Sequence, residues 1–277
     1  MNNRALVLAI PLGWLAVFLL VPLAIVLVIA LAGPGEGIPP FTIGFHPQNF
    51  VALATDNFYL GAAWRSIQVA GISAVACLLI AYPMAFAITR APTNWRPLLL
   101  TLAILPFWTG FLLRITAWIG LLRDDGWVNA VLAALGIPGA PFVLLYTQFA
   151  MYIGIAYTYL PFMLLPLYTS LSRRDRALED AAADLGATPW RIFRRIIFPL
   201  SLPGIRAGLL LVFIPALGEF VIPDLLGGPG AETLGRVLWS EFFTNRDWPT
   251  AAALAVVLLV LLMLPAAWWQ HREGRRQ

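Results

Sequence analysis

Two charged residues, Arg114 and Glu219, lie deep inside long apolar segments of this 277-residue sequence. If those segments cross a membrane, each charge is costly and marks a candidate functional site. Counting along the two segments from Leu98 and Pro203 places both charges ~24 Å from the same side. They could therefore form an ion pair between two helices. Alternatively, Glu219 could line a pathway and bind a cation, and the two roles could alternate if the cation competes with Arg114.

Residues suited to catalysis are scarce. All 18 basic residues are arginine, so the sequence has no lysine with which a P-loop could bind nucleotide phosphates. Any ATP has to be hydrolysed by another polypeptide. Cys77 is the only cysteine, and His46 and His271 lie outside the apolar segments. We therefore expect no catalytic residues, metal or cofactor, and we disfavour an intramembrane hydrolase, which needs a nucleophile beside a base.

The composition is that of a chain whose solvent is lipid. Hydrophobic residues make up 60% of the sequence, charged residues 12%, and the mean hydropathy is +0.82. About 20 helical residues cross a hydrocarbon core, and six apolar runs reach that length. They cover roughly Ala5–Ala32, Ile67–Ile88, Leu98–Leu121, Phe142–Leu171, Gly204–Ile222 and Thr250–Trp269. The first run could be read as a signal peptide, but it is about twice the usual length of a signal core.

The arginines predict the orientation. With the N-terminus inside, thirteen arginines lie in or beside the cytoplasm and four lie outside, which satisfies the positive-inside rule. Both termini are then cytoplasmic. The outer segments carry eight acids, which either reflect this bias or attract cations toward an entrance.

The loop between the fourth and fifth runs, Ser172 to Ile205, predicts a helix–turn–helix hairpin. Leu178, Ala182 and Leu185 share one helical face, and Gly186 ends the helix in a left-handed conformation. Thr188 and Pro189 then open a second helix as its cap and first residue. In that helix the aromatic and apolar residues Trp190, Phe193 and Ile197 lie on one side, opposite Arg191, Arg194 and Arg195. Such a hairpin could simply lie on the membrane surface.

The same loop resembles the EAA loop of permease subunits of ABC importers. The matching residues and their close neighbours are Asp180, Ala181, Ala182, Leu185, Gly186, Ala187, Ile196 and Pro199. Two positions depart from the pattern, because the family usually has glutamate at Asp180 and leucine at Phe198. The shorter acid could weaken an ion pair with another subunit.

This resemblance implies an all-α, polytopic protein with six transmembrane helices and the type I importer permease (MetI-like) fold. One permease domain would occupy residues 1–277, with a first span at 5–32, a core at about 60–270 and a coupling loop at about 172–200. It also implies a bacterial inner-membrane location, two ATPase subunits, a second permease subunit that is a paralogue, a secreted or periplasmic binding protein, and no nucleic acid. In such permeases the loop inserts into a groove on the ATPase.

Four further stretches resemble the putrescine and spermidine branch of these permeases. They are Pro106–Leu122, Tyr152–Tyr168, Phe213–Gly228 and Gly235–Pro249. The resemblance implies a polyamine substrate. Within this branch, the sequence is similar to the putrescine-type permease. Trp108, Phe111, Tyr157 and Tyr159 could offer ring faces to an alkylammonium chain, or they could be interfacial anchors.

Two alternatives remain open on the sequence alone. A permease for another small solute would share the coupling loop, although the outer acids and Glu219 weigh against an anion. A secondary transporter would work without an ATPase, and it would leave the loop pattern unexplained.

Overall fold

The computed structural model describes residues 3–273, and the side chains of 9–263. Within that part the regular elements are helices, apart from a two-stranded antiparallel ladder of β1 (Gly33–Pro34) with β2 (Phe41–Thr42). The long helices are α1 (Asn3–Ala30), α3 (Asn57–Arg90), α7 (Gln148–Ser172), α10 (Phe198–Leu217) and α13 (Trp248–Glu273). The shorter ones are α2 (Gln48–Thr55), α4 (Arg96–Ile104), η1 (Leu105–Trp108), α5 (Phe111–Leu122), α6 (Trp127–Ala134), α8 (Ala177–Asp184), α9 (Pro189–Ile192), η2 (Phe193–Ile197), α11 (Val221–Leu226), α12 (Leu234–Trp239) and η3 (Ser240–Thr244).

Helical segments occupy the positions of all six predicted spans. By length and composition, four can cross a membrane without a break: Ala9–Ala30, Asn57–Arg90, Gln148–Ser172 and Pro189–Leu217. A fifth candidate is a bent pair, Arg96–Trp108 with Phe111–Ala134. At the sixth position, α13 is apolar from Trp248 to Met263 within the part searched. The all-α, multi-pass architecture is therefore confirmed.

The third predicted span is not straight. Its two halves meet at an angle of 86°, because the backbone is extended at Thr109 (ψ 151°) and Gly110 (ψ 142°). Pro106 has no N–H to continue the helical ladder, and the Thr109 hydroxyl donates to the Pro106 carbonyl at 2.7 Å. Counting 1.5 Å per residue from Leu98 to Arg114 was therefore wrong, since that count assumes one continuous helix.

The fifth predicted span is interrupted near its end. Helix α10 ends at Leu217 with Gly218 as its cap, and α11 begins at Val221. Glu219 lies in the interruption.

The chain divides into two compact units, residues 1–64 with 234–277 and residues 65–233. Helix α3 contributes to both, and the prediction of one domain over 1–277 stays a prediction. In the first unit α1, α2 and α13 surround a small core. Its buried members are Ala30, Leu53, Ala62, Leu234, Val237, Ala252, Ala253 and Leu254.

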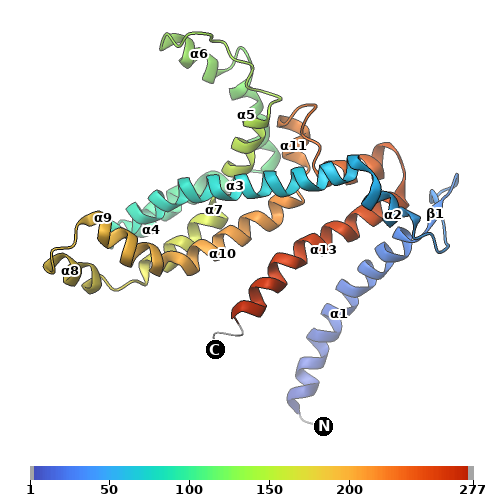
Figure 1. Ribbon diagram of the computed structural model, residues 1–277, viewed down its shortest axis with the longest axis horizontal. Helices are drawn as coiled ribbons and strands as arrows, with labels where there is room; N and C mark the ends of the chain where they lie inside the picture. Colours follow the sequence, from blue (N-terminus) through green and yellow to red (C-terminus); the bar gives the residue numbers. More distant parts are fainter. Residues whose placement is uncertain (1–2, 274–277) are drawn as a thin grey trace. The chain divides into compact units, whose positions relative to one another are not determined.

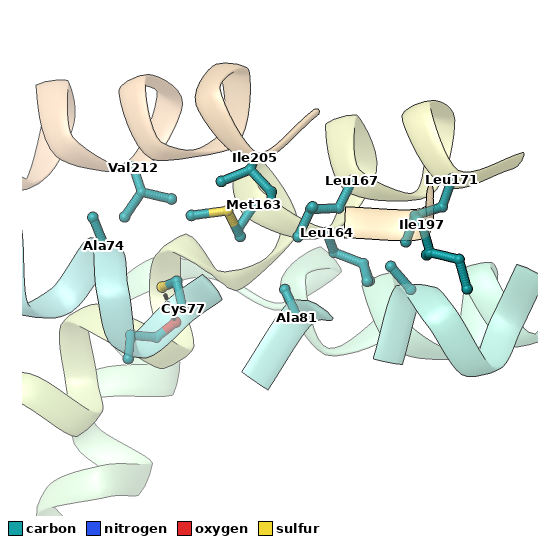
Figure 2. Packing of buried hydrophobic residues seen from close by; sticks show 12 residues of the cluster. Ala74, Cys77, Ala81, Met163, Leu164, Leu167, Leu171, Ile197, Ile205 and Val212 are labelled. Atoms are coloured by element: carbon teal, nitrogen blue, oxygen red, sulfur yellow. Dashed lines mark hydrogen bonds between the residues drawn. The ribbon is translucent and has the colours of Figure 1, made fainter. Parts of the chain in front are cut away.

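In the second unit, α3, α7 and α10 run alongside one another (Figure 1) and share one core. Small residues of α3, among them Ala74, Cys77 and Ala81, meet Met163, Leu164 and Leu167 of α7 (Figure 2). Helices α7 and α10 approach closely at two glycines. A Cβ atom at Gly204 would lie 2.6 Å from the Pro166 carbonyl oxygen, and one at Gly208 2.5 Å from the Met163 sulfur. Glycine thus permits backbone contact between these helices, as in other membrane bundles.

Candidate functional site

The predicted hairpin is present between α7 and α10. Helix α8 ends in a Schellman motif: Gly186 has φ +77°, its N–H donates to the Ala183 carbonyl (2.8 Å), and the Ala187 N–H donates to the Ala182 carbonyl (3.0 Å). This arrangement satisfies carbonyls that the helix leaves free. At the other end of α8 the Asp175 carboxylate accepts the Ala177 N–H at 2.9 Å, as expected for an acid near a helix N-terminus.

The second helix of the hairpin starts at Pro189, as predicted, with Thr188 in an extended conformation. Two details differ from the sequence expectation. The Thr188 side chain makes no capping hydrogen bond. The second helix is also not separate from the fifth span, which the sequence places from about Gly204: α9 passes through the wide turn η2 directly into α10, giving one helix from Pro189 to Leu217. The hairpin is therefore rigidly joined to the fifth span.

The tip of the hairpin exposes apolar side chains. Leu185 is 89% exposed, Trp190 68% and Leu178 50%. Asp180, Ala181 and Gly186 are exposed beside them, as is Pro199, whereas Ala182, Ala187 and Ile196 are half-buried. Trp190 stacks on Phe193 with ring centroids 5.5 Å apart. Clustered exposed apolar residues of this kind indicate a surface that contacts another protein or the membrane.

An ion-pair cluster attaches the hairpin to the end of α3, and sequence reasoning missed it. Glu179 of α8 pairs with Arg174 at 2.6 Å and with Arg90 of α3 at 3.1 Å. Arg176 donates to the Thr89 carbonyl, which lies in the last turn of α3. The Arg174 side chain is only 4% exposed. We call Glu179, Arg174, Arg90 and Arg176 the α8 clamp.

The α8 clamp borders a hollow of about 690 Å³ whose other walls include Trp190 and Phe193. Arg90 and Arg174 both lie over the ring of Phe86, at 4.5 and 5.3 Å. The hairpin is thereby connected to α3 through the clamp and to α10 through continuous helix.

Glu219 is buried, with 8% of its surface exposed. Its Oε1 accepts the N–H groups of Val221 (3.0 Å) and Ile222 (3.3 Å) at the start of α11. Its Oε2 accepts the Tyr159 hydroxyl at 2.5 Å, and the Thr233 hydroxyl donates to its backbone carbonyl at 3.2 Å. The carboxylate thus caps α11 and ties it to α7.

The structure shows no ion pair between Arg114 and Glu219 in the described part of the chain. The guanidinium lies over the rings of Phe107 (5.1 Å) and Phe111 (6.0 Å). Its Nε and Nη1 atoms are buried without a hydrogen-bond partner.

Helix α7 explains the separation of the two charges. Tyr159 binds Glu219, whereas Tyr157 packs against Phe107 and Trp118, with centroids 5.5 Å away in each case. Residues two apart on a helix do not face the same side. Arg114 and Glu219 therefore lie against different sides of α7.

Three of the four predicted aromatic residues contact other residues of this chain. Phe111 lies beneath the Arg114 guanidinium, Tyr157 packs against other rings, and Tyr159 donates a hydrogen bond to Glu219. Trp108 is the exception, with 83% of its surface exposed.

Comparisons with known proteins match nearly the whole chain. Residues 5–276 match the family described as "Binding-protein-dependent transport system inner membrane component". The chain is 41% identical to the "Spermidine/putrescine transport system permease protein PotB" of Haemophilus influenzae over 260 residues, covering 93% of this chain and 90% of that protein. The protein of the same name from Escherichia coli is 38% identical over 246 residues, which cover 89% of each chain.

Among solved structures, the chain resembles one described as a bacterial ABC transporter involved in the import of the acidic polysaccharide alginate. The TM-score is 0.78 at 18% identity, over 99% of this chain and 96% of the other. This likeness supports the fold.

Proposed function

Because the chain belongs to the family of binding-protein-dependent transport system inner membrane components, we propose that it is one permease subunit of an ATP-driven polyamine importer. It forms half of the translocation pathway, and a paralogous permease forms the other half. Two ATPase subunits hydrolyse ATP on the cytoplasmic side, and a periplasmic or secreted binding protein delivers the substrate. Both termini are cytoplasmic.

The observation that carries this proposal is the hairpin. Its exposed apolar tip offers a docking surface for an ATPase, and the helix from Pro189 to Leu217 leads from that tip to the break beside Glu219. A movement imposed at Leu185 or Trp190 reaches the interruption through one continuous helix and through a core in which glycines bring α7 and α10 into contact. This is a mechanical connection between ATP hydrolysis and the membrane interior.

The substrate class rests on two independent supports. The relatives named spermidine/putrescine permeases are 38% and 41% identical over about nine-tenths of the chain. Glu219 also places a buried carboxylate where the fifth span is interrupted, and a passing ammonium group can replace the Tyr159 hydroxyl as donor to Oε2. An anionic substrate would be repelled there.

Uptake of labelled putrescine and spermidine by cells lacking the chain, with and without a plasmid copy, tests the proposal. We expect uptake to require the copy and to be inhibited by unlabelled polyamine but not by an acidic sugar. Restored uptake of a labelled anion, with no polyamine uptake, would contradict the proposed substrate and leave the permease role intact.

A further inference from the structure

The guanidinium of Arg114 is the clearest unmet charge in the membrane-spanning part of the second unit. Its Nε and Nη1 atoms are buried and have no hydrogen-bond partner. The rings of Phe107 and Phe111 attract the cation, but ring faces accept no strong N–H hydrogen bonds in place of water. Arg114 as a whole residue is half-buried, but buried guanidinium nitrogens ordinarily pair with an anion or another acceptor, so this geometry is incomplete.

Arg114 lines a hollow of about 410 Å³ at the bend between η1 and α5. The other walls include Pro106, Thr109, Leu113, Trp118 and Tyr157, and Arg114 is the only charged residue among the residues that line it. The Thr109 hydroxyl already donates to Pro106. The hollow therefore selects an anion, and the planar fork of arginine favours a carboxylate or a phosphate.

Depth decides between those two anions. Tyr157 lies nine residues after the first residue of α7 and fifteen before its last, or ~13 Å and ~22 Å along the helix axis. The hydrocarbon core is about 30 Å thick, so the hollow lies within it, away from lipid phosphates. A polyamine is a cation and is repelled by Arg114. The anion consequently has to be a carboxylate carried into the membrane by protein.

This chain does not supply that carboxylate in the part that the structure describes. The intramembrane acid of the second unit, Glu219, is held by Tyr159 and by the N–H groups of α11. The surface beside the hollow is apolar and uncovered: Trp108 is 83% exposed, Leu113 69% and Leu112 60%. A central arginine within an apolar surround is typical of an interface whose binding energy is concentrated at one residue.

We propose that a carboxylate side chain on a membrane span of the second permease subunit enters this hollow and pairs with Arg114. The inference rests on the proposed function only in taking that second subunit as the partner. The pair fixes the bent third span against the other half of the pathway.

Site-specific cross-linking tests the contact directly. A photoreactive benzoylphenylalanine replaces Leu113, which lines the hollow, in the complete membrane-embedded assembly. The matched control carries the same group at Leu79, which is 70% exposed on α3. We expect Leu113 to cross-link to a peptide of the second permease that contains an Asp or Glu, and Leu79 not to reach that peptide. Cross-links from Leu113 only to lipid, to this chain or to a peptide without an acid would overturn the proposal.

Charge exchange tests the pairing itself. Arg114→Met leaves the partner's acid buried and unpaired, so recovery of the second permease with tagged chain should fall roughly thirtyfold or more. Arg114→Glu should lower the recovery of the second permease similarly. Changing the cross-linked acid of the partner to arginine should then restore that recovery. A role confined to packing on Phe107 and Phe111 would show no such rescue. Unchanged recovery in Arg114→Met would overturn the proposal.

Two controls separate this inference from the proposed function. Co-purification of the ATPase with each variant reports on the hairpin, which Arg114 does not contact. The wild-type chain could import polyamine with its second permease while Arg114→Met assembles normally. That result would contradict the proposed pairing of Arg114 and leave the proposed importer function intact. If no second permease accompanies the wild-type chain, the importer proposal fails first.

Discussion

At the scale of single residues, two tyrosines of α7 serve two different charges. Tyr159 donates to the Glu219 carboxylate, and Tyr157 packs in the aromatic cluster beside Arg114. Both carboxylate oxygens of Glu219 are satisfied without any cationic side chain. In the described part of the chain the carboxylate is therefore held by neutral donors alone.

Tyr159→Phe should destabilise the protein. The change keeps the ring but leaves the Glu219 Oε2 buried without a donor, which typically costs ~1 to 3 kcal/mol. Thermal unfolding of the purified assembly in detergent measures the effect. Tyr152→Phe is the control, because Tyr152 is half-buried on the same helix and makes no hydroxyl hydrogen bond in the described part. Equal unfolding midpoints for the two variants would show that the Tyr159 hydrogen bond does not stabilise the protein.

The sequence identified Arg114 and Glu219 as unusual because charges in apolar runs are visible without any structure. Their partners could not be predicted. The depth count treated Leu98–Leu121 as straight, whereas extended backbone at Thr109 and Gly110 redirects the chain. The hydroxyl donor to Glu219 comes from Tyr159, 60 positions away, and such a contact leaves no local sequence signal.

At the scale of elements, the hairpin was predictable because its signals are local. Glycine at position 186 and the Thr188–Pro189 pair mark its turn, and the apolar spacing marks its two helices. Two features needed the structure: the uninterrupted passage from α9 through η2 into α10, and the α8 clamp, in which Arg90 and Glu179 are 89 residues apart. Contacts between distant segments depend on how the helices pack.

Gly186→Val should abolish transport-coupled ATP hydrolysis while the protein still inserts in the membrane. A Cβ at this position meets no atom within 4 Å, so the penalty comes from the positive φ that a β-branched residue resists. Gly136→Val is matched, since Gly136 has φ +69° and equally open surroundings but lies outside the hairpin. We expect substrate-stimulated ATPase activity to be lost only in Gly186→Val. Loss in both variants would point to general misfolding.

Glu179→Gln should uncouple ATP hydrolysis from uptake by releasing α8 from α3. Arg174 would stay buried without its counter-charge, and breaking a fully buried pair costs roughly 3 to 5 kcal/mol. The cost here should be smaller, because Arg90 is 54% exposed. Asp125→Asn removes an exposed pair with Arg123, whose side chains are 74% and 61% exposed, and should have little effect. The ratio of ATP hydrolysed to substrate imported measures coupling, and an unchanged ratio in Glu179→Gln would remove the α8 clamp from the mechanism.

At the scale of the whole molecule, hydropathy was sufficient to predict the multi-pass, all-α fold. Spans are set by length and composition, which are properties of the sequence. The bend in the third span and the division into two units, with α3 contributing to both, depend on long-range packing and were not predicted.

The orientation of the chain rests on its arginines and can be tested by reporter fusions. A fusion at Ala140 should report the outer side and one at the C-terminal Gln277, which lies outside the described residues, the cytoplasm. The expected difference follows from the positive-inside rule. If both fusions report the same side, the predicted topology is wrong.

ATP-driven uptake in proteoliposomes tests the central claim most directly. The complete assembly is reconstituted with ATP inside or outside, and labelled spermidine is supplied with the binding protein on the opposite side. We predict uptake that requires ATP on the hairpin side and is lost in Gly186→Val but not in Gly136→Val. Uptake that proceeds equally without ATP, driven by an ion gradient, would contradict the claim that this chain is the permease of an ATP-driven importer.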